Sequence, residues 1–196
     1  NTTGTDEGSF QGSKVFSYTG AVMTLPTGVQ AISENNYGHP DRALDYLKRM
    51  SRSFSYALPG SMYEVSPDYG MIAQAWNIYS FAVPVIGQFF GIQPQAAQKE
   101  ITINPLMPRA WDQAHLENVK VADNEISVYY EVEPTGSTLL KITQTEEDWT
   151  VRLILEKARQ EELEVIRGTV ITQQQGETHV EIVCRGGAVE VRYKTY

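Results

Sequence analysis

The 196-residue sequence is poor in cysteine and in positive charge, and it has no long apolar run. Its one cysteine, Cys184, excludes an intrachain disulfide and favours a reducing compartment such as the cytoplasm. Sixteen lysines and arginines against 24 aspartates and glutamates give a net charge of −8. An acidic chain repels phosphates, so we expect no nucleic-acid partner. No run of about 18 uncharged apolar residues occurs, so we expect no transmembrane helix and no membrane partner.

Motifs for phosphate, metal and nucleophilic-serine chemistry are also missing. The sequence has no glycine-rich phosphate loop, no paired His/Cys metal spacing and no Gly-x-Ser-x-Gly turn. The three histidines are scattered, so we expect no metal and no cofactor. The chain starts with neither an initiator methionine nor a charged signal sequence, and we therefore expect it to be a piece of a longer polypeptide.

Two different hydrophobic periodicities divide the chain. Residues 1–98 carry 7 acidic and 5 basic side chains, and residues 99–196 carry 17 and 11. Apolar residues recur at helical spacing in the first part, as in Ala43, Leu44, Leu47 and Met50. They alternate with polar residues after Glu100, with turn residues between the runs. This pattern predicts an α+β chain, with a helical part at 1–98 and an antiparallel β-sandwich at 99–196.

Three local predictions follow from these patterns. A long apolar helix is expected over residues 71–90, interrupted at Pro84, because no charged residue lies between Asp68 and Lys99. A helix that is apolar nearly all round should be covered by a second polypeptide or by the rest of the same one. Residues 156–165 are expected to form strand–turn–strand, and Cys184 is expected to be buried as a small apolar residue.

One loop stands out as a place for chemistry. Residues 59–70 hold a carboxylate, Glu64, among aromatic residues and between glycines and prolines, directly before the apolar helix. Loops that a rigid scaffold positions often carry function. From the residues alone, the favoured interpretation is that Glu64 caps the following helix or lies in solvent.

The order of several short motifs resembles that in the six-hairpin, (α/α)6-barrel glycoside hydrolases. Gly-Ser-Met-Tyr-Glu at 60–64, followed by Gln-Ala-Trp at 74–76, resembles the last hairpin of these barrels. Residues 25–28 and 37–43 resemble the preceding barrel helices, and residues 101–111 resemble the start of the small β-sandwich that follows. Within this group the chain resembles the glycogen-debranching (amylo-α-1,6-glucosidase-like) enzymes and the bacterial α-L-rhamnosidases, and the resemblance covers roughly residues 20–132.

This resemblance implies that the chain is the C-terminal part of a glycoside hydrolase, made of the last helices of an (α/α)6 barrel and a β-sandwich. Glu64 would be the general base of an inverting reaction, with Tyr63, Gln74 and Trp76 binding the carbohydrate substrate. The general acid would come from the remainder of the catalytic barrel, in an upstream segment or a second chain. Asp68 is the fallback for the catalytic role. The sugar and the linkage stay open.

Two other functions stay open as well. A polysaccharide lyase of the toroid-plus-sandwich type would use a tyrosine or histidine base, so that Tyr63 or Tyr69 would matter more than Glu64. A non-catalytic carbohydrate-binding or structural module would present Trp111 and Trp149 as exposed platforms, whereas the opposing interpretation buries both tryptophans.

Overall fold

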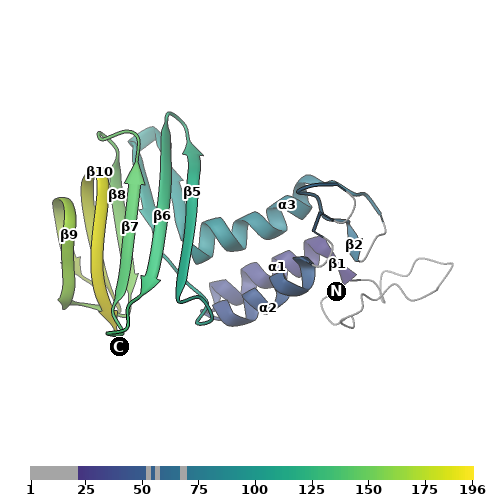
Figure 1. Cartoon of the computed structure of the whole chain (residues 1–196), viewed down its shortest axis with the longest axis horizontal. Coiled ribbons are helices and arrows are strands. Elements are labelled where there is room, and N and C mark those ends of the chain that lie inside the picture. The colour runs from purple at the N-terminus through teal and green to yellow at the C-terminus, as the bar shows by residue number, and fades with distance from the viewer. Residues whose placement is uncertain (1–21, 52–53, 56–57, 67–69) are drawn as a thin grey trace. The chain divides into compact units, whose positions relative to one another are not determined.

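The computed structural model describes residues 22–51, 54–55, 58–66 and 70–196. The chain divides into two compact units, Asn1–Phe89 and Phe90–Tyr196 (Figure 1). Residues 90–98, which the sequence pattern groups with the helical part, belong to the second unit. There they contribute the strand β3 (Ile92–Gln95) and the short 3-10 helix η3 (Ala96–Gln98).

The first unit is helical. Its elements are β1 (Val22–Met23), α1 (Thr24–Asn36), α2 (Pro40–Met50), β2 (Val65–Ser66), α3 (Ala75–Ala82) and the π-helix η2 (Val83–Phe89). In α2, Pro40 occupies the start, Lys48 and Arg49 lie in the last turn, and the four apolar residues that the sequence places on one face are all buried. The short strands β1 and β2 pair antiparallel.

Helices α1 and α3 cross closely at Gly28. A Cβ atom at this position would lie 2.1 Å from Ser80 Cβ and 2.5 Å from Ser80 Cα. Only glycine leaves room for the two backbones to approach so closely. The crossing therefore depends on the absence of a side chain at Gly28.

The apolar helix that the sequence predicts over residues 71–90 is shorter and changes type. The α-helix begins at Ala75 and becomes π-helical at Val83, so Pro84 lies at the second position of η2. Proline has no N–H to donate and disrupts the α-helical ladder, which accounts for the interruption predicted there.

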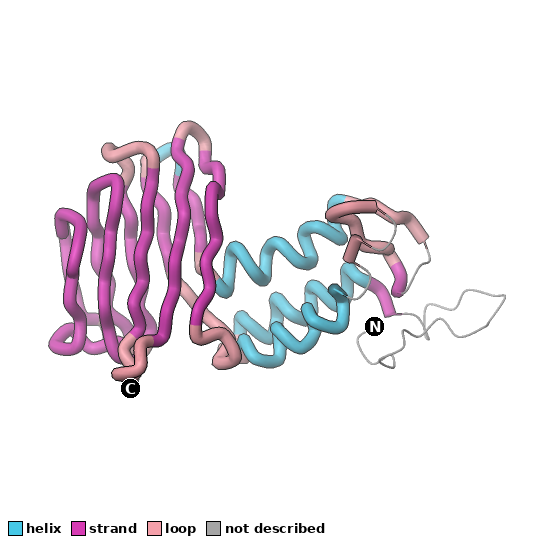
Figure 2. The backbone as a smooth tube through the Cα atoms, viewed as in Figure 1, coloured by secondary structure: helices cyan, strands magenta, loops and turns pink. Residues whose placement is uncertain are grey.

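The second unit is built from strands. They are β3, β4 (Glu100–Ile103), β5 (Gln113–Val121), β6 (Asn124–Val132), β7 (Thr138–Gln144), β8 (Thr150–Glu156), β9 (Ala158–Gln175) and β10 (His179–Thr195). They form one eight-stranded sheet in the order β3-β4-β8-β10-β7-β6-β5, with β9 paired to β10 (Figure 2). Only Lys157 separates β8 from β9, which confirms the strand–turn–strand prediction for residues 156–165.

The long strand β10 joins two layers of this sheet. Its first half pairs with β8, and its second half pairs with β7. Figure 1 shows β5, β6, β7, β10 and β9 side by side, with β8 behind them. Strand β4 pairs parallel with β8, whereas the other neighbours in the sheet are antiparallel.

The predicted fold class is therefore wrong. The described residues contain three α-helices and not the hairpins of an (α/α)6 barrel, and the β part is a single, nearly closed mixed sheet instead of an antiparallel sandwich. Alternation of apolar residues identifies a strand and its buried face, but it does not identify the neighbouring strand or its direction.

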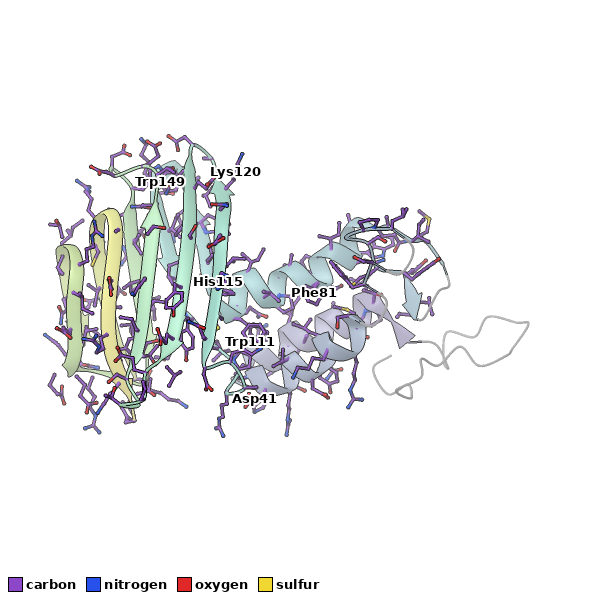
Figure 3. All side chains as sticks on the ribbon, in the orientation of Figure 1. Asp41, Phe81, Trp111, His115, Lys120 and Trp149 are labelled. Carbon is purple, nitrogen blue, oxygen red and sulfur yellow. The ribbon has the colours of Figure 1, made fainter. Side chains whose placement is uncertain are left out.

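The core of the second unit contains Cys184 and Trp149. Cys184 on β10 is fully buried, as predicted, and burial raises the pKa of its thiol to about 11. Trp149 is fully buried as well (Figure 3). Trp149 is therefore not the exposed sugar platform that the binding-module hypothesis requires, and Trp111 is partly exposed.

Candidate functional site

The loop that carries Glu64 is held by its backbone against the start of α1. The Glu64 amide donates to the Met71 carbonyl at 2.9 Å, and the Glu64 carbonyl accepts from the Thr24 amide at 2.9 Å. The hydroxyl of Thr24, a buried residue, donates to the Tyr63 carbonyl. Two consecutive carbonyls of the loop thus bind one threonine, so the position of Glu64 is set by the N-terminus of α1.

The carboxylate of Glu64 is half-buried and is held from one side. Its Oε2 accepts a hydrogen bond from the Met71 amide at 3.3 Å. Gly70 lies against it with φ +79°, and a Cβ there would stand 2.7 Å from Glu64 Oε2. Within residues 58–66 and 70–196, and in α1 and α2, no further hydrogen bond to this carboxylate is found. The second oxygen, Oε1, therefore keeps its capacity to accept a proton or a hydrogen bond.

Asn77 on α3 anchors the same loop from a second side. Its Nδ2 donates to the Met62 carbonyl at 2.8 Å, and the residue is only 1% exposed. Its Oδ1 and the Oε1 of Gln74 are both buried, and neither has a hydrogen-bond partner among the described residues. Among the described residues, one unpaired acceptor thus lies on α3 and another lies directly before its first turn. Buried acceptors without partners are uncommon and often indicate a missing water or ligand.

The residues predicted for the site are brought together only in part. Tyr63 is adjacent to Glu64 and is half-buried, and Gln74 stands immediately before the first turn of α3. The polar contacts of Glu64 go to Thr24 and Met71, not to Gln74 or Trp76. Asp68 and Tyr69 lie outside the described residues.

Asn77 is the residue that sequence reasoning missed. An amide side chain in the middle of an otherwise apolar helix is the signal that could have identified it, because such a group must find a partner if it faces inward. The apolar character of residues 71–90 concealed it.

In helix α3 polar side chains are buried and large apolar side chains are exposed, which is the reverse of the usual arrangement. Its buried residues are the polar Asn77 and Ser80, whereas Trp76 is 47% exposed, Ile78 59% and Tyr79 47%. Met71 and Ile72, just before the helix, are also exposed. A cluster of exposed large apolar side chains is typical of a surface that another segment covers.

The described residues hold no group of three or more His, Cys, Asp or Glu side chains that could bind a metal ion. None of the helices among them is both long enough and apolar enough to cross a membrane. The Glu64 loop offers a positioned carboxylate, and α3 with Gln74 before it offers two buried acceptors and an exposed tryptophan.

No family model and no curated protein matches the chain. Solved structures similar to it include two α-L-rhamnosidases. One is an α-L-rhamnosidase from Streptomyces avermitilis complexed with L-rhamnose, with a TM-score of 0.58 and 16% identity over 87% of this chain. The other is an α-L-rhamnosidase from Dictyoglumus thermophilum, with a TM-score of 0.51 and 13% identity over 88% of this chain. The match spans 18% and 21% of those chains, so the chain is similar in fold to about a fifth of each. The rhamnosidase part of the sequence resemblance is thus supported at the level of fold.

Proposed function

We propose that this chain is the base-carrying portion of a glycoside hydrolase, and that Glu64 is its general base. The observation that carries the proposal is the double anchoring of the Glu64 loop, to Thr24 on one side and to Asn77 on the other, with one carboxylate oxygen left unpaired among the described residues. The fold likeness to two α-L-rhamnosidases makes an α-L-rhamnoside the first substrate to test.

The geometry suits the activation of water. A general base must be ionised and within hydrogen-bond reach of the proton that it removes. The Met71 amide donates to Glu64 Oε2, while Oε1 is available to a water molecule. In an inverting hydrolase the water attacks the anomeric carbon from the face opposite the leaving group, so the acid and the base stand roughly 6.5–9.5 Å apart. The acid comes from a segment or chain outside these 196 residues.

The groups on α3 have roles in substrate binding under this proposal. The unpaired Oε1 of Gln74 and Oδ1 of Asn77 accept hydrogen bonds from sugar hydroxyls or from the attacking water. The half-exposed ring of Trp76 stacks on the apolar face of a sugar. Tyr63 precedes the base and orients it or the sugar.

The test is the Glu64→Gln variant in the assembled enzyme, which is this chain together with the segment or chain that holds the acid. The amide keeps the shape of the side chain and loses the proton acceptor. We expect kcat on an aryl α-L-rhamnoside to fall by about 10²–10⁴-fold, with KM nearly unchanged, because the lost interaction belongs to the transition state. Proton NMR of the first sugar released should show the inverted anomer.

Asp45→Asn is the matched control, because Asp45 is an exposed carboxylate of the same unit that pairs with Arg49 on the surface of α2. This variant should retain full activity. Near-normal kcat in Glu64→Gln together with inactive Asp68→Asn would transfer the role to Asp68. Ultraviolet-absorbing unsaturated products would show a lyase instead, and the hydrolase proposal would fail.

A further inference from the structure

The second unit contains a hollow where β10 passes from β8 to β7. Arg185 is the last β10 residue that pairs with β8, and Ala188 is the first that pairs with β7. On its other edge β10 pairs with β9. Arg185 lies opposite Thr169, and the next paired residue of β10, Glu190, lies opposite Arg167.

Residues 186–189 of β10 therefore face Gly168 alone on β9. Extra residues in one strand bend it and take it out of the ladder, and such bulges often re-aim side chains at functional sites. The result is a hollow of about 700 Å³, formed entirely within the second unit.

Three glycines, Gly168, Gly186 and Gly187, are among the residues that line this hollow. Gly168 and Gly186 have φ values of +110° and +129°, so neither can be replaced without strain. Buried Gln144 donates from Nε2 to the carbonyls of Gly186 and Trp149, both at 3.0 Å. These two bonds tie the bend of β10 to the turn that follows β7, which preorganises the hollow.

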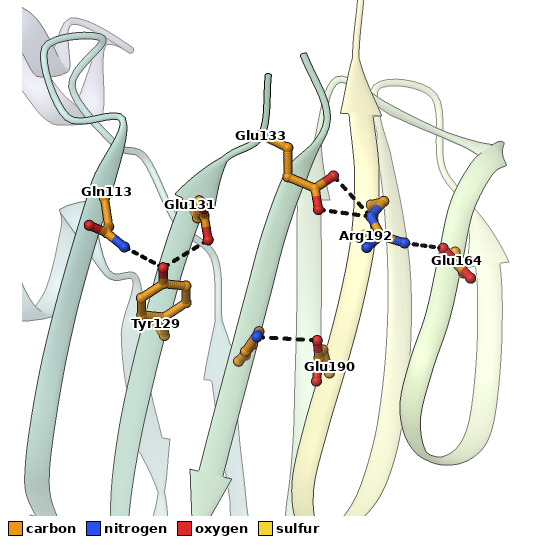
Figure 4. Close-up of polar contacts among 8 residues, drawn as sticks. Gln113, Tyr129, Glu131, Glu133, Glu164, Glu190 and Arg192 are labelled. Atoms are coloured by element: carbon orange, nitrogen blue, oxygen red, sulfur yellow. Dashed lines mark hydrogen bonds and ion pairs between the residues drawn. The ribbon is translucent and has the colours of Figure 1, made fainter. Parts of the chain in front are cut away.

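Two arginines line the hollow without a carboxylate partner. Arg167 and Arg185 are both exposed, and neither forms an ion pair with a residue that the structure describes. By contrast, Arg192 is held by Glu133 and Glu164 (Figure 4).

Two neighbouring carboxylates form ion pairs with lysines. Glu190, which lies opposite Arg167 in the register, pairs with Lys141 at 3.5 Å. Asp148, near Arg185, pairs with Lys99. One further carboxylate, Glu147, lines the hollow itself. Two arginines that form no ion pair among the described residues thus line one hollow, in a part of the chain that carries 17 acidic and 11 basic side chains.

We propose that this hollow binds a hexuronic acid, a sugar that carries a carboxylate. The planar guanidinium groups of Arg167 and Arg185 match a carboxylate in shape and charge. Glu147 accepts hydrogen bonds from hydroxyls, whereas it repels a small anion such as sulfate. A neutral sugar leaves both guanidinium groups without their counter-charge. The site goes beyond the proposed hydrolysis, since binding here requires neither Glu64 nor turnover.

The experiment is calorimetric titration of the 196-residue chain with D-glucuronate. We expect a Kd of about 1 mM, which is typical of a monosaccharide with a few polar contacts. D-Glucose, which has the same ring without the carboxylate, should bind at least about tenfold more weakly. Arg167→Gln and Arg185→Gln should each weaken glucuronate binding by about tenfold or more, because each removes a charge-assisted hydrogen bond.

Arg159→Gln is the matched control. Arg159 lies on β9 as well, but its guanidinium stacks on Tyr196 at 4.9 Å and does not line the hollow. This variant should bind glucuronate like the wild type. Circular dichroism checks the fold of each variant, and Arg167→Lys, which keeps the charge but loses the planar fork, should bind a few-fold more weakly. The proposal is overturned if glucuronate does not bind, if sulfate binds equally well, or if Arg159→Gln loses as much affinity as the other two.

Discussion

Replacing Gly28 by alanine should destabilise the first unit, although alanine is the better helix former. The new Cβ would stand 2.1 Å from Ser80 Cβ, and ordinary van der Waals contact begins at 3.4 Å. The shortfall is 1.3 Å, the difference between these two distances. A clash with Ser80 Cα, at 2.5 Å, cannot be relieved by turning a side chain, so α1 and α3 must move apart.

The expected cost follows from two opposing effects. Overpacking a tight contact costs about 1–3 kcal/mol, and a clash with backbone belongs to the upper part of that range. Alanine recovers about 1 kcal/mol through its helix propensity. The free energy of unfolding of this unit should therefore fall by about 1–2 kcal/mol, which corresponds to a drop in Tm of roughly 4–16 °C for a unit of this size.

Urea denaturation of the chain, followed by helical ellipticity in the far ultraviolet, measures this effect, because the α-helices among the described residues all belong to the first unit. Gly87→Ala is the control, since Gly87 is helical and a methyl group added there would meet no atom within 4 Å. That variant should be neutral or stabilised by up to about 1 kcal/mol. If Gly28→Ala is as stable as the wild type, the close crossing of α1 and α3 is wrong.

Two further predictions concern pH and the exposed face of α3. Burial holds the pKa of Cys184 near 11 in the folded chain against 9.0 for the free thiol, so the unfolded state loses its proton first. The free energy of unfolding should therefore fall between pH 9 and 11, by up to roughly 2–3 kcal/mol. In urea denaturation, Cys184→Ala should remove that part of the pH dependence. An unchanged pH profile in this variant would contradict the raised pKa of Cys184. In the assembled enzyme, Trp76 and Tyr79 should be protected from hydroxyl-radical footprinting, whereas both should react in the isolated chain; equal reactivity in the two samples would refute the covering of α3.

The sequence by itself determined the local structure of this protein wherever a local rule decides it. Pro40 and the spacing of four apolar residues were enough to define α2 and its buried face. The alternation around Cys184 was enough to place that residue inside a sheet, and Pro84 was enough to interrupt the last helix. The position of Glu64 in a loop between glycines and prolines could also be identified from the sequence, and its role is a proposal.

Only the tertiary structure decided which segments meet. Backbone hydrogen bonds are the same for every side chain, so alternation could not show that β4 runs parallel to β8 or that β10 changes partners at Gly186. Of the two anchors of the Glu64 loop, Thr24 lies 39 residues before Tyr63 and carries no local signal. Asn77 is nearer in the chain, but its amide in an apolar helix does not show which carbonyl it binds. Arg167 and Arg185 line the same hollow because of a bulge in the pairing of β9 with β10, and no local pattern encodes that bulge.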